Sequence, residues 1–579
     1  MTSPVIVVGG GPVGLGAALE LSRFGVHTVV LEQHEGATRH PKTRIINART
    51  VEIARGWGAV VYERLRGIDT PDDWKSPIRF LRSVVGEELG RIESEGFVGP
   101  GPAVSPVQAI LSSQDLLEQV LCDAALATRL IEVRYGHRLE SVLHGWEDGA
   151  REAAVVVNDL SRDEQYELEG AALVAADGVA STVRSQLGIE LEGVQDVSYF
   201  INCHFRADVE RHVGERSGIL FFVANDGAVG VLQPLDARGR WLCQIVVSPE
   251  QWHDAEAFSH DDCRAWIRSA VGVDDVDPEI LGVGRWRMNA TVAAGLVHGR
   301  VVLCGDAAHQ FPPTGGLGVN TGIHGMHNAI WKLAMVVQGH AGQRLLQTYD
   351  DERRPVARWA AEQSLQNHRD VQRIAAANMG FAENPMTAED IARAARRYGN
   401  HFGVEFGATY QSAAVISDGT SGPEVEDSFS DYAPSGHPGG RAPHVWLGRG
   451  GARLSTIDLF GPGFTVLGGC KGREWASAAT AVRKRRGVSI AAYVIGDAGL
   501  EDREGIFHER YGIETDGAVL VRPDGVVAWR AATGRDGHAA QLEDVVARLL
   551  DQSDSRPAPA TVASSLEGRK SNLHQEEHA

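Results

Sequence analysis

The hydrophobic pattern at the start of the chain predicts a strand, a glycine loop, a helix and a second strand. Residues 4–8 form a short apolar run rich in β-branched side chains, which is typical of a strand buried on both faces. The glycine-rich segment 9–14 follows, and apolar side chains then recur at helical spacing as far as residue 24. Gly25 ends the predicted helix, and the apolar run 28–31 predicts the second strand. This order predicts a βαβ unit.

Further along, the pattern predicts a second β-rich region, a helical region and a small separate domain. In the β-rich region, about residues 197–284, apolar runs flank the hairpin signal Asn225-Asp226-Gly227, and residues 241–247 predict a third strand. Residues 345–406 are charged with a helical pattern, and the Gly/Pro-rich stretch 434–440 predicts a linker. Strand-like runs at 464–467, 488–495 and 517–529, interleaved with helical segments, predict a small α/β domain.

Composition narrows the class of protein. The chain has 579 residues, 43% of them hydrophobic, which predicts three or four domains. Its net charge of −20 argues against nucleic acid or an anionic membrane surface as a partner. There is no apolar run of about 18 residues to span a bilayer, no basic region before the first strand, and no cysteine spacing typical of a metal site or a disulfide framework. We therefore expect a cytoplasmic enzyme, with a polar, disordered tail from residue 553.

The glycine loop carries the first chemical motif, Gly9-x-Gly11-x-x-Gly14. Between a strand and a helix, such glycines let the backbone approach a pyrophosphate, whose charge the helix N-terminus stabilises. Glu32 ends the next strand, where its carboxylate can accept hydrogen bonds from ribose hydroxyls. A structural turn with a solvent-facing glutamate is the alternative, and the motif alone fits NAD as well as FAD.

Two later segments distinguish these cofactors. An apolar strand leads into Asp177-Gly178, followed by Ser181 and Arg184, and residues 299–322 contain a Gly305-Asp306 pair after another strand. With these segments the chain resembles the group A flavin-dependent aromatic monooxygenases over about residues 4–360. Residues 402–444 resemble most closely the 2,4-dichlorophenol 6-monooxygenase and tetracenomycin-type polyketide hydroxylases, and the C-terminal region resembles the tail domain of phenol hydroxylases.

The resemblance implies an α/β fold with three parts. These are a Rossmann-like FAD-binding domain of the p-hydroxybenzoate hydroxylase type, an inserted β-sheet substrate domain, and a C-terminal thioredoxin-like domain that lacks a CxxC pair. The expected FAD-binding domain comprises residues 1–75, 101–194 and 285–360, and the substrate domain 76–100 and 195–284. A helical segment and linker, 361–433, then leads to the thioredoxin-like domain, 434–552, and to the disordered tail, 553–579.

The resemblance also implies FAD as cofactor and assigns residues to it. Asp306 is expected to accept a hydrogen bond from a ribityl hydroxyl, and the loop Gly315–Asn320, followed by a helix, is expected to point backbone N–H groups at the negative charge of the reduced ring. The expected FAD contacts are Gly9, Gly11, Pro12, Val13, Gly14, Glu32, Gln33, Arg44, Gln114, Leu139, Asp177, Gly178, Gly305, Asp306, Pro313, Gly316, Gly318, Val319 and Asn320.

Arg44, Pro313 and Gln233 are the residues expected beside the reacting atoms. Arg44 is the best match to a family arginine among the polar residues Arg39, Arg44, Asn47 and Arg49, although a solvated basic loop is the alternative for each. The substrate is expected to lie between the β-rich region and the Pro312-Pro313 loop. Candidate wall residues are Tyr199, Asn202, His204, Phe221, Gln233, Pro234 and Trp286, of which strand alternation allows only about half to face the pocket.

The family reaction implied is hydroxylation of a phenolic or other electron-rich aromatic ring. NADPH or NADH reduces the FAD, O2 adds to give a flavin C4a-hydroperoxide, and this transfers OH to the substrate. Three alternatives stay open: a Baeyer–Villiger or epoxidising oxygenase acting on a polyketide, a catalytically silent flavin-binding interaction protein, and an NAD dehydrogenase. A homodimer is also left open, and the Ala, Gly and Arg content suggests a bacterial source.

One position departs from the family pattern. Gly325 and Met326 stand where the family has Asp and Ala, which puts the local packing in question. The nearby histidines, His309, His324 and His327, are predicted to be structural rather than catalytic, and Cys304 is predicted to be a buried core thiol.

Overall fold

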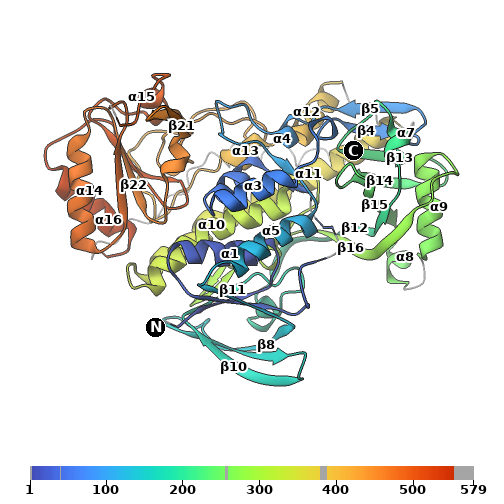
Figure 1. Cartoon of the computed structure of the whole chain (residues 1–579), viewed down its shortest axis with the longest axis horizontal. Coiled ribbons are helices and arrows are strands. Elements are labelled where there is room, and N and C mark those ends of the chain that lie inside the picture. The colour runs from blue at the N-terminus through green and yellow to red at the C-terminus, as the bar shows by residue number, and fades with distance from the viewer. Residues whose placement is uncertain are drawn as a thin grey trace, which may run out of the picture.

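The computed structural model describes residues 3–38, 41–42, 44–254, 258–378, 388–497 and 499–552. Three parts follow one another along the long axis of the molecule (Figure 1): the C-terminal domain, a central domain built around the N-terminal strands, and an eight-stranded sheet. The predicted tail, 553–579, and Arg39 lie outside the described residues.

The central domain contains a six-stranded sheet in the order β17-β18-β11-β1-β2-β7. Strand β1 pairs in parallel with β2 on one side and β11 on the other, so the carboxyl ends of these strands meet at one edge. The predicted βαβ unit is confirmed, with helix α1 between β1 and β2. The sheet strands are β1 (Val5–Val8), β2 (Thr28–Glu32), β7 (Ile131–Tyr135), β11 (Ala172–Ala175), β17 (Val297–His298) and β18 (Val301–Leu303).

Helices cover one face of this sheet. Helix α1 (Pro12–Arg23) packs against both α5 (Gln114–Leu126) and α10 (Leu317–Val337), and Figure 1 shows the three helices side by side. Shorter elements complete the domain: β3 (Ile45–Ile46), α2 (Ala48–Arg55), α3 (Ala59–Gly67), β6 (Ile110–Leu111) and α6 (Thr182–Gln186). A separate three-stranded antiparallel sheet consists of β8 (His137–His144), β9 (Ala153–Asp159) and β10 (Glu164–Gly170).

The eight-stranded sheet has the order β19-β16-β12-β15-β14-β13-β4-β5. Two long antiparallel strands, β12 and β16, run from the central domain into it. The predicted hairpin at Asn225 is confirmed, since β13 pairs antiparallel with β14 across it. The strands are β4 (Ile78–Leu81), β5 (Glu88–Ile92), β12 (Leu191–Arg206), β13 (Leu220–Ala224), β14 (Val229–Pro234), β15 (Arg240–Val247), β16 (Glu279–Ala293) and β19 (His309–Gln310).

Alternation divides the side chains of this sheet between two faces. On one face, Ile201, Cys203 and Phe205 of β12 join a buried cluster with Trp266 and Ile267 of helix α9 (His260–Val271). The alternate residues of β12, among them Asn202, face the opposite side, toward the central domain. Helices α7 (Glu210–Val213), α8 (Pro249–His253) and α9 lie between β12 and β16 in the sequence.

The predicted helical region consists of three helices within the described residues. Helix α11 (Gln343–Asn378) is followed by α12 (Ala388–Gly399) and α13 (Phe402–Phe406). The predicted linker, 434–440, has no helix or strand, but Gly436 N–H donates to the Arg510 carbonyl at 2.7 Å and Gly439 N–H to the Val527 carbonyl at 2.8 Å. This segment is therefore packed along the C-terminal domain.

The C-terminal domain is a mixed α/β unit, as the strand and helix pattern predicted. Its four-stranded sheet has the order β23-β22-β24-β25, in which β22 pairs in parallel with β23 and antiparallel with β24. Trp331 of α10 meets Phe464 edge-on at 5.9 Å, so the core of this domain is continuous with the central one. The elements are β20 (Trp446–Arg449), β21 (Ala452–Ser455), β22 (Phe464–Gly468), α14 (Arg473–Arg486), β23 (Ile490–Val494), α15 (Phe507–Tyr511), β24 (Ala518–Val521), β25 (Val527–Ala531) and α16 (His538–Leu549).

Among the described residues, no helix is both long enough and apolar enough to cross a membrane.

Candidate functional site

One large cavity joins the carboxyl edge of the six-stranded sheet to the face of the eight-stranded sheet. Its volume is about 2270 Å³, and its wall includes Gly9, Glu32 and Asp306 at one end and Asn202 and Trp286 at the other. A site for one small molecule usually encloses about 300–1,000 Å³. The cavity therefore has room for a dinucleotide and a second ligand next to it.

The glycine loop at the end of β1 has no space for side chains. A Cβ atom on Gly9, whose φ is +105°, would lie 2.2 Å from the Ala176 carbonyl oxygen, and one on Gly14 would lie 2.0 Å from the Gly9 carbonyl oxygen. Helix α1 begins directly after Gly11, and no side chain caps its N-terminal N–H groups. These groups are available to an anion at the mouth of the loop.

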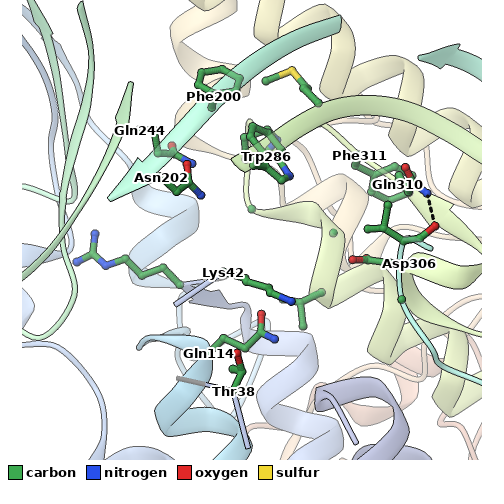
Figure 2. Close-up of a pocket in the computed structure, with 18 of the residues that line it drawn as sticks. Thr38, Lys42, Gln114, Phe200, Asn202, Gln244, Trp286, Asp306, Gln310 and Phe311 are labelled. Carbon is green, nitrogen blue, oxygen red and sulfur yellow. Dashed lines mark hydrogen bonds between the residues drawn. The ribbon is translucent and has the colours of Figure 1, made fainter. Parts of the chain in front are cut away.

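Glu32 lies at the end of β2, beside this loop. Its carboxylate accepts a hydrogen bond from Gly10 N–H at 2.7 Å and another from His34 N–H at 2.9 Å. The glutamate thus holds the glycine loop and its own strand end together while facing the cavity. On α5, Gln114 Nε2 donates to Glu118 Oε1 at 2.6 Å, and Figure 2 shows Gln114 beside Thr38 on the cavity wall.

Arg184 links the segment that contains Asp177-Gly178 to the one that contains Gly305-Asp306. Its buried guanidinium donates to the Ala307 carbonyl at 3.1 Å and to the Val179 carbonyl at 3.0 Å. The Asp177 carboxylate accepts from Val183 N–H at 3.2 Å, and its Oδ1 atom has no hydrogen-bond partner within the described part of the chain. A buried acceptor of this kind has unused capacity for a ligand hydroxyl.

Asp306 follows β18 and opens into the cavity. Burial raises the pKa of this carboxyl, and the positive charge of Lys42 opposes that shift. In Figure 2, Lys42 extends into the space between Gln114 and Asp306. Lys42 was not predicted, because a lysine in a basic segment resembles a solvated surface residue until its position in the fold is known.

Helix α10 begins beside Asp306, after a left-handed Gly316 with φ +65°. No side chain caps this helix, so its N–H groups can interact with negative charge in the cavity. Asn320 lies behind this wall: its side chain donates to the Ile45 carbonyl at 3.0 Å and to the Gly316 carbonyl at 2.7 Å, and accepts from Asn47 N–H at 3.0 Å. Asn320 therefore shapes the loop from behind.

Most of the predicted cofactor positions line the cavity. Gly14 and Asn320 do not; both support the wall through contacts with the backbone. The predicted residues that line it are Gly9, Gly11, Pro12, Val13, Glu32, Gln33, Arg44, Gln114, Leu139, Asp177, Gly178, Gln233, Gly305, Asp306, Pro313, Gly316, Gly318 and Val319.

Arg44 is buried where the two ends of the cavity meet. Its Nη1 atom donates to the Ile219 carbonyl in the eight-stranded-sheet region, while Nε and Nη2 have no hydrogen-bond partner among the described residues. Burial lowers the pKa of Arg44 to about 9. Two unused donors on a buried cation are suited to an anionic or carbonyl-bearing ligand. Asn47 and Arg49 are outside the cavity wall; Arg49 pairs with Glu52 at 3.0 Å.

At the other end, the sheet separates the predicted wall residues into two groups. Asn202, His204, Gln233 and Trp286 line the cavity. Tyr199, Phe221 and Pro234 do not: Tyr199 packs beside Trp252 at 5.4 Å, and Phe221 is fully buried beside Trp241 at 5.9 Å. Alternation was expected to exclude about half of the strand candidates, and the structure shows that these three lie outside the cavity wall.

Several wall residues come from segments that the sequence did not suggest. Helix α11 contributes side chains although it lies more than a hundred residues after most of the sheet. Figure 2 also shows Phe200 and Gln244 near Asn202, and Phe311 and Gln310 nearer Asp306. Gln310 Nε2 donates to the Val179 carbonyl. The unpredicted residues include Phe80, Phe200, Phe222, Gln244, Met288, Asn289, Gln310, Phe311, Val371, Gln372, Ala375 and Tyr398.

The histidines near α10 have structural partners. His327 contacts Glu20 at 3.0 Å and His324 contacts the Thr50 hydroxyl at 3.2 Å. His309 stacks on Phe311 with 4.7 Å between ring centres, and burial lowers its pKa to about 3, so this ring is neutral at pH 7. The buried Cys304 thiol is a core residue as predicted.

Gly325 faces a buried arginine. A Cβ atom at Gly325 would lie 3.8 Å from Arg353 Nε and 3.4 Å from the Tyr349 hydroxyl. Arg353 Nη1 donates to the Tyr410 hydroxyl at 2.8 Å, while Nε has no hydrogen-bond partner in the described ranges. The departure at Gly325 thus leaves open the position beside Arg353 where an aspartate would extend.

Comparison with known proteins matches both the central and the C-terminal regions. Residues 2–364 match the model of the FAD binding domain family, and residues 435–553 match the family described as aromatic-ring hydroxylase, C-terminal. The chain is 34% identical to 2,4-dichlorophenol 6-monooxygenase of Delftia acidovorans, over 94% of this chain and 98% of that protein. It is 36% identical to aklavinone 12-hydroxylase of Streptomyces purpurascens, over 95% and 99%.

Solved structures of flavin-dependent enzymes also match the chain. The flavin-dependent monooxygenase PieE, in complex with FAD and substrate, is 34% identical and superposes with a TM-score of 0.87, covering 96% of this chain and 100% of that one. Aklavinone-11 hydroxylase with FAD and aklavinone is 35% identical with a TM-score of 0.82, covering 95% and 99%. Fold and matches define a flavin-dependent monooxygenase with FAD as cofactor. The chain belongs to the FAD-dependent aromatic-ring hydroxylase family.

Proposed function

We propose that this enzyme hydroxylates a phenolic or other electron-rich aromatic ring, with NADPH or NADH as electron donor and O2 as co-substrate. The observation that carries the proposal is the single cavity that connects the glycine loop and Asp306 with the sheet residues Asn202 and Trp286. A cofactor bound at the first end and an aromatic ring at the second would share one cavity. The substrates named for two relatives, a dichlorophenol and aklavinone, support an aromatic substrate.

The residues at the first end fit FAD. The α1 N-terminus and the glycine loop would hold its pyrophosphate, and Glu32 would accept hydrogen bonds from its ribose. Asp306 and the free Asp177 Oδ1 atom would accept hydrogen bonds from hydroxyl groups of the cofactor. When bound, the flavin takes electrons from the nicotinamide and activates O2.

The second half of the proposal concerns what the protein does for the substrate. The uncapped N-terminus of α10, after Gly316, would stabilise the negative charge that a reduced ring carries. Pro313, Arg44 and Gln233 lie on the cavity wall, where they would limit the positions open to the ring. Phe311, stacked on the neutral His309, provides an apolar wall that helps to exclude water.

The first test is the absorbance of the bound flavin during anaerobic addition of NADPH, with and without a panel of phenols and larger aromatic compounds. We expect one class of compound to accelerate bleaching of the flavin strongly, and its aerobic product to gain one hydroxyl oxygen. Reduction that no aromatic compound accelerates would overturn the proposed function. A product with a lactone or an epoxide would instead assign the Baeyer–Villiger or epoxidising alternative.

A further inference from the structure

We infer that the substrate is an uncharged, polycyclic aromatic compound of at least three rings with neighbouring carbonyl or hydroxyl oxygens, and that Asn202 and Gln244 bind those oxygens. This inference rests on the proposed function and concerns the part of the cavity formed by the eight-stranded sheet. It adds a substrate class and a pair of binding residues, of which only Asn202 was expected from the sequence to line the pocket.

The first argument for a substrate of several rings is the width of the sheet wall. All eight strands contribute cavity-lining residues, and most of these residues lie on the six adjacent strands β16, β12, β15, β14, β13 and β4. Because neighbouring strands lie about 4.8 Å apart, this wall is roughly 24 Å across. A single six-membered ring would cover only a small part of it and would leave space for water around the reacting carbon. A flat molecule of several fused rings would cover much more of the wall.

The second argument, for oxygens on the substrate, is the pair of amide side chains Asn202 and Gln244. Asn202 of β12 and Gln244 of β15 are direct partners in antiparallel register, and both side chains face the cavity. Such partners have Cβ atoms about 4.5–5.5 Å apart, and Figure 2 shows the two amides side by side. Asn202 is only 8% exposed, and its Oδ1 atom has no hydrogen-bond partner within the described residues. A buried amide without a partner is costly unless a ligand supplies one.

Aromatic side chains flank the amide pair on two sides. Phe200 and Trp286 lie with ring centres 5.0 Å apart, one step along β12 and β16 from Asn202. Phe80 and Phe222 are stacked, also 5.0 Å apart, on the strands farther across the sheet. These two pairs provide apolar contact for fused rings, while the two amides between them provide two NH2 groups as donors and two carbonyl oxygens as acceptors. Oxygens on adjacent rings would meet both amides at once.

The charges on this wall argue for a substrate without a carboxylate, sulfate or phosphate group. Arg240 is held by Asp115 at 2.6 Å and Arg287 by Asp196 at 3.1 Å. The third lining arginine of the sheet, Arg285, donates to the Asp254 carbonyl. Each arginine on the strands of the sheet wall therefore already has an acceptor, and the unused donors of Arg44 lie where the two ends of the cavity meet rather than on the sheet.

The experiment uses the FAD-loaded enzyme and four probes: phenol, 2-naphthol, 1,8-dihydroxyanthraquinone and the 3-carboxylate of that anthraquinone. Dissociation constants come from quenching of protein and flavin fluorescence, and the rate of anaerobic flavin reduction is measured with each probe. We expect the neutral three-ring compound to bind at least 100-fold more tightly than phenol and at least 10-fold more tightly than its carboxylate. It should also accelerate reduction the most.

Variants test the two amides. Asn202→Leu and Gln244→Met keep side-chain size but remove the polar atoms, and each should weaken binding of 1,8-dihydroxyanthraquinone about 10-fold while leaving that of anthracene unchanged. Gln165→Met, at an exposed position of β10, is the matched control and should change neither.

Each outcome decides a different point. Equal binding of phenol and the three-ring compound, with either accelerating reduction, would overturn the substrate class and leave the hydroxylase function in place. Wild-type affinity of both amide variants for the hydroxyquinone would overturn the assignment of Asn202 and Gln244. If no probe accelerates reduction in any variant, the proposed function itself fails.

Discussion

Arg522 and Glu352 form a fully buried ion pair, with 2.7 Å between Nη1 and Oε1, that joins the C-terminal domain to helix α11. Asp524 contacts the same guanidinium, and Lys332 of α10 donates to Glu352 at 2.8 Å. Burial acts to raise the pKa of Glu352, but Arg522 and Lys332 outweigh it and hold that pKa well below its usual value. The domain therefore attaches to the FAD-binding core through charges with no access to water.

This geometry predicts a large loss of stability when Arg522 is replaced. Arg522→Met leaves Glu352 and Asp524 buried with less compensating charge, and removing one partner of a buried pair costs about 3–5 kcal/mol of unfolding free energy. The measurement is urea-induced unfolding followed by tryptophan fluorescence, since Trp331 and Trp475 lie in the core shared by the two domains.

Arg503→Met provides the matched control. Arg503 pairs with Glu501 at 2.9 Å, but the side chains are 58% and 54% exposed. A pair of this kind contributes about 0–1 kcal/mol. Similar destabilisation by the two substitutions would contradict the role assigned to the buried cluster.

The same ion pair marks a limit of sequence-based prediction. The motifs at residues 9–14, 177–178 and 305–306 each combine a strand, a turn and a helix start within a few residues, so their local structure followed from local patterns. Arg522 and Glu352 are 170 residues apart, and neither position shows a pattern that indicates burial. An isolated arginine or glutamate is normally predicted to be on the surface.

The cavity shows a second limit. Alternation predicted correctly that only some of the β12 and β13 residues face the cavity, but which of them do so depends on which face of the sheet α9 covers. Tyr199 and Asn202 were therefore both candidates for the wall, and only Asn202 lines the cavity. Wall residues from α11, such as Val371, could not be inferred because packing of a distant helix leaves no signal in the strands.

Asp306 is predicted to contribute directly to FAD affinity. Its carboxylate opens into the cavity beside the helix that Gly316 precedes. A hydrogen bond to a charged group contributes about 1.5–3 kcal/mol, so Asp306→Ala should raise the dissociation constant of FAD roughly 10- to 100-fold. Fluorescence of FAD released into an ultrafiltrate measures this. The exposed Asp274→Ala should bind FAD as the wild type does, and unchanged affinity in Asp306→Ala would remove Asp306 from the site.

Gly325 is predicted to be a position where a carboxylate stabilises the fold. Arg353 is already buried, and its Nε atom has no partner in the described ranges. A new carboxylate beside it would therefore form an ion pair without any further loss of water by the arginine. Gly325→Asp should place a carboxylate within reach of that atom and raise the thermal midpoint above that of Gly325→Ala and Gly325→Asn. The alanine variant measures helix propensity alone, about 1 kcal/mol. A midpoint for the aspartate variant at or below that of the asparagine variant would show that Arg353 does not accept this partner.

Glu405 is predicted to make stability decrease as pH rises through neutrality. Its Oε1 atom accepts from Arg49 N–H at 2.8 Å, while Oε2 has no hydrogen-bond partner among the described residues and lies 3.8 Å from His401 Nδ1. Burial raises the pKa of Glu405 to about 8 from the ordinary 4.5. Between those values the folded state holds a proton that the unfolded chain has lost, so the free energy of unfolding falls as pH rises.

Glu405→Gln isolates this effect, because the amide resembles the protonated acid and does not titrate. From pH 5 to pH 8, the unfolding free energy of the wild type should fall relative to that of Glu405→Gln by a few kcal/mol, at about 1.4 kcal/mol per pKa unit. Taking the difference between the two curves cancels the titration of other groups that behave alike in both proteins. The exposed Glu63→Gln should give a curve parallel to the wild type. Parallel curves for wild type and Glu405→Gln would mean that Glu405 is ionised in the folded protein at pH 7, with a partner for its charge.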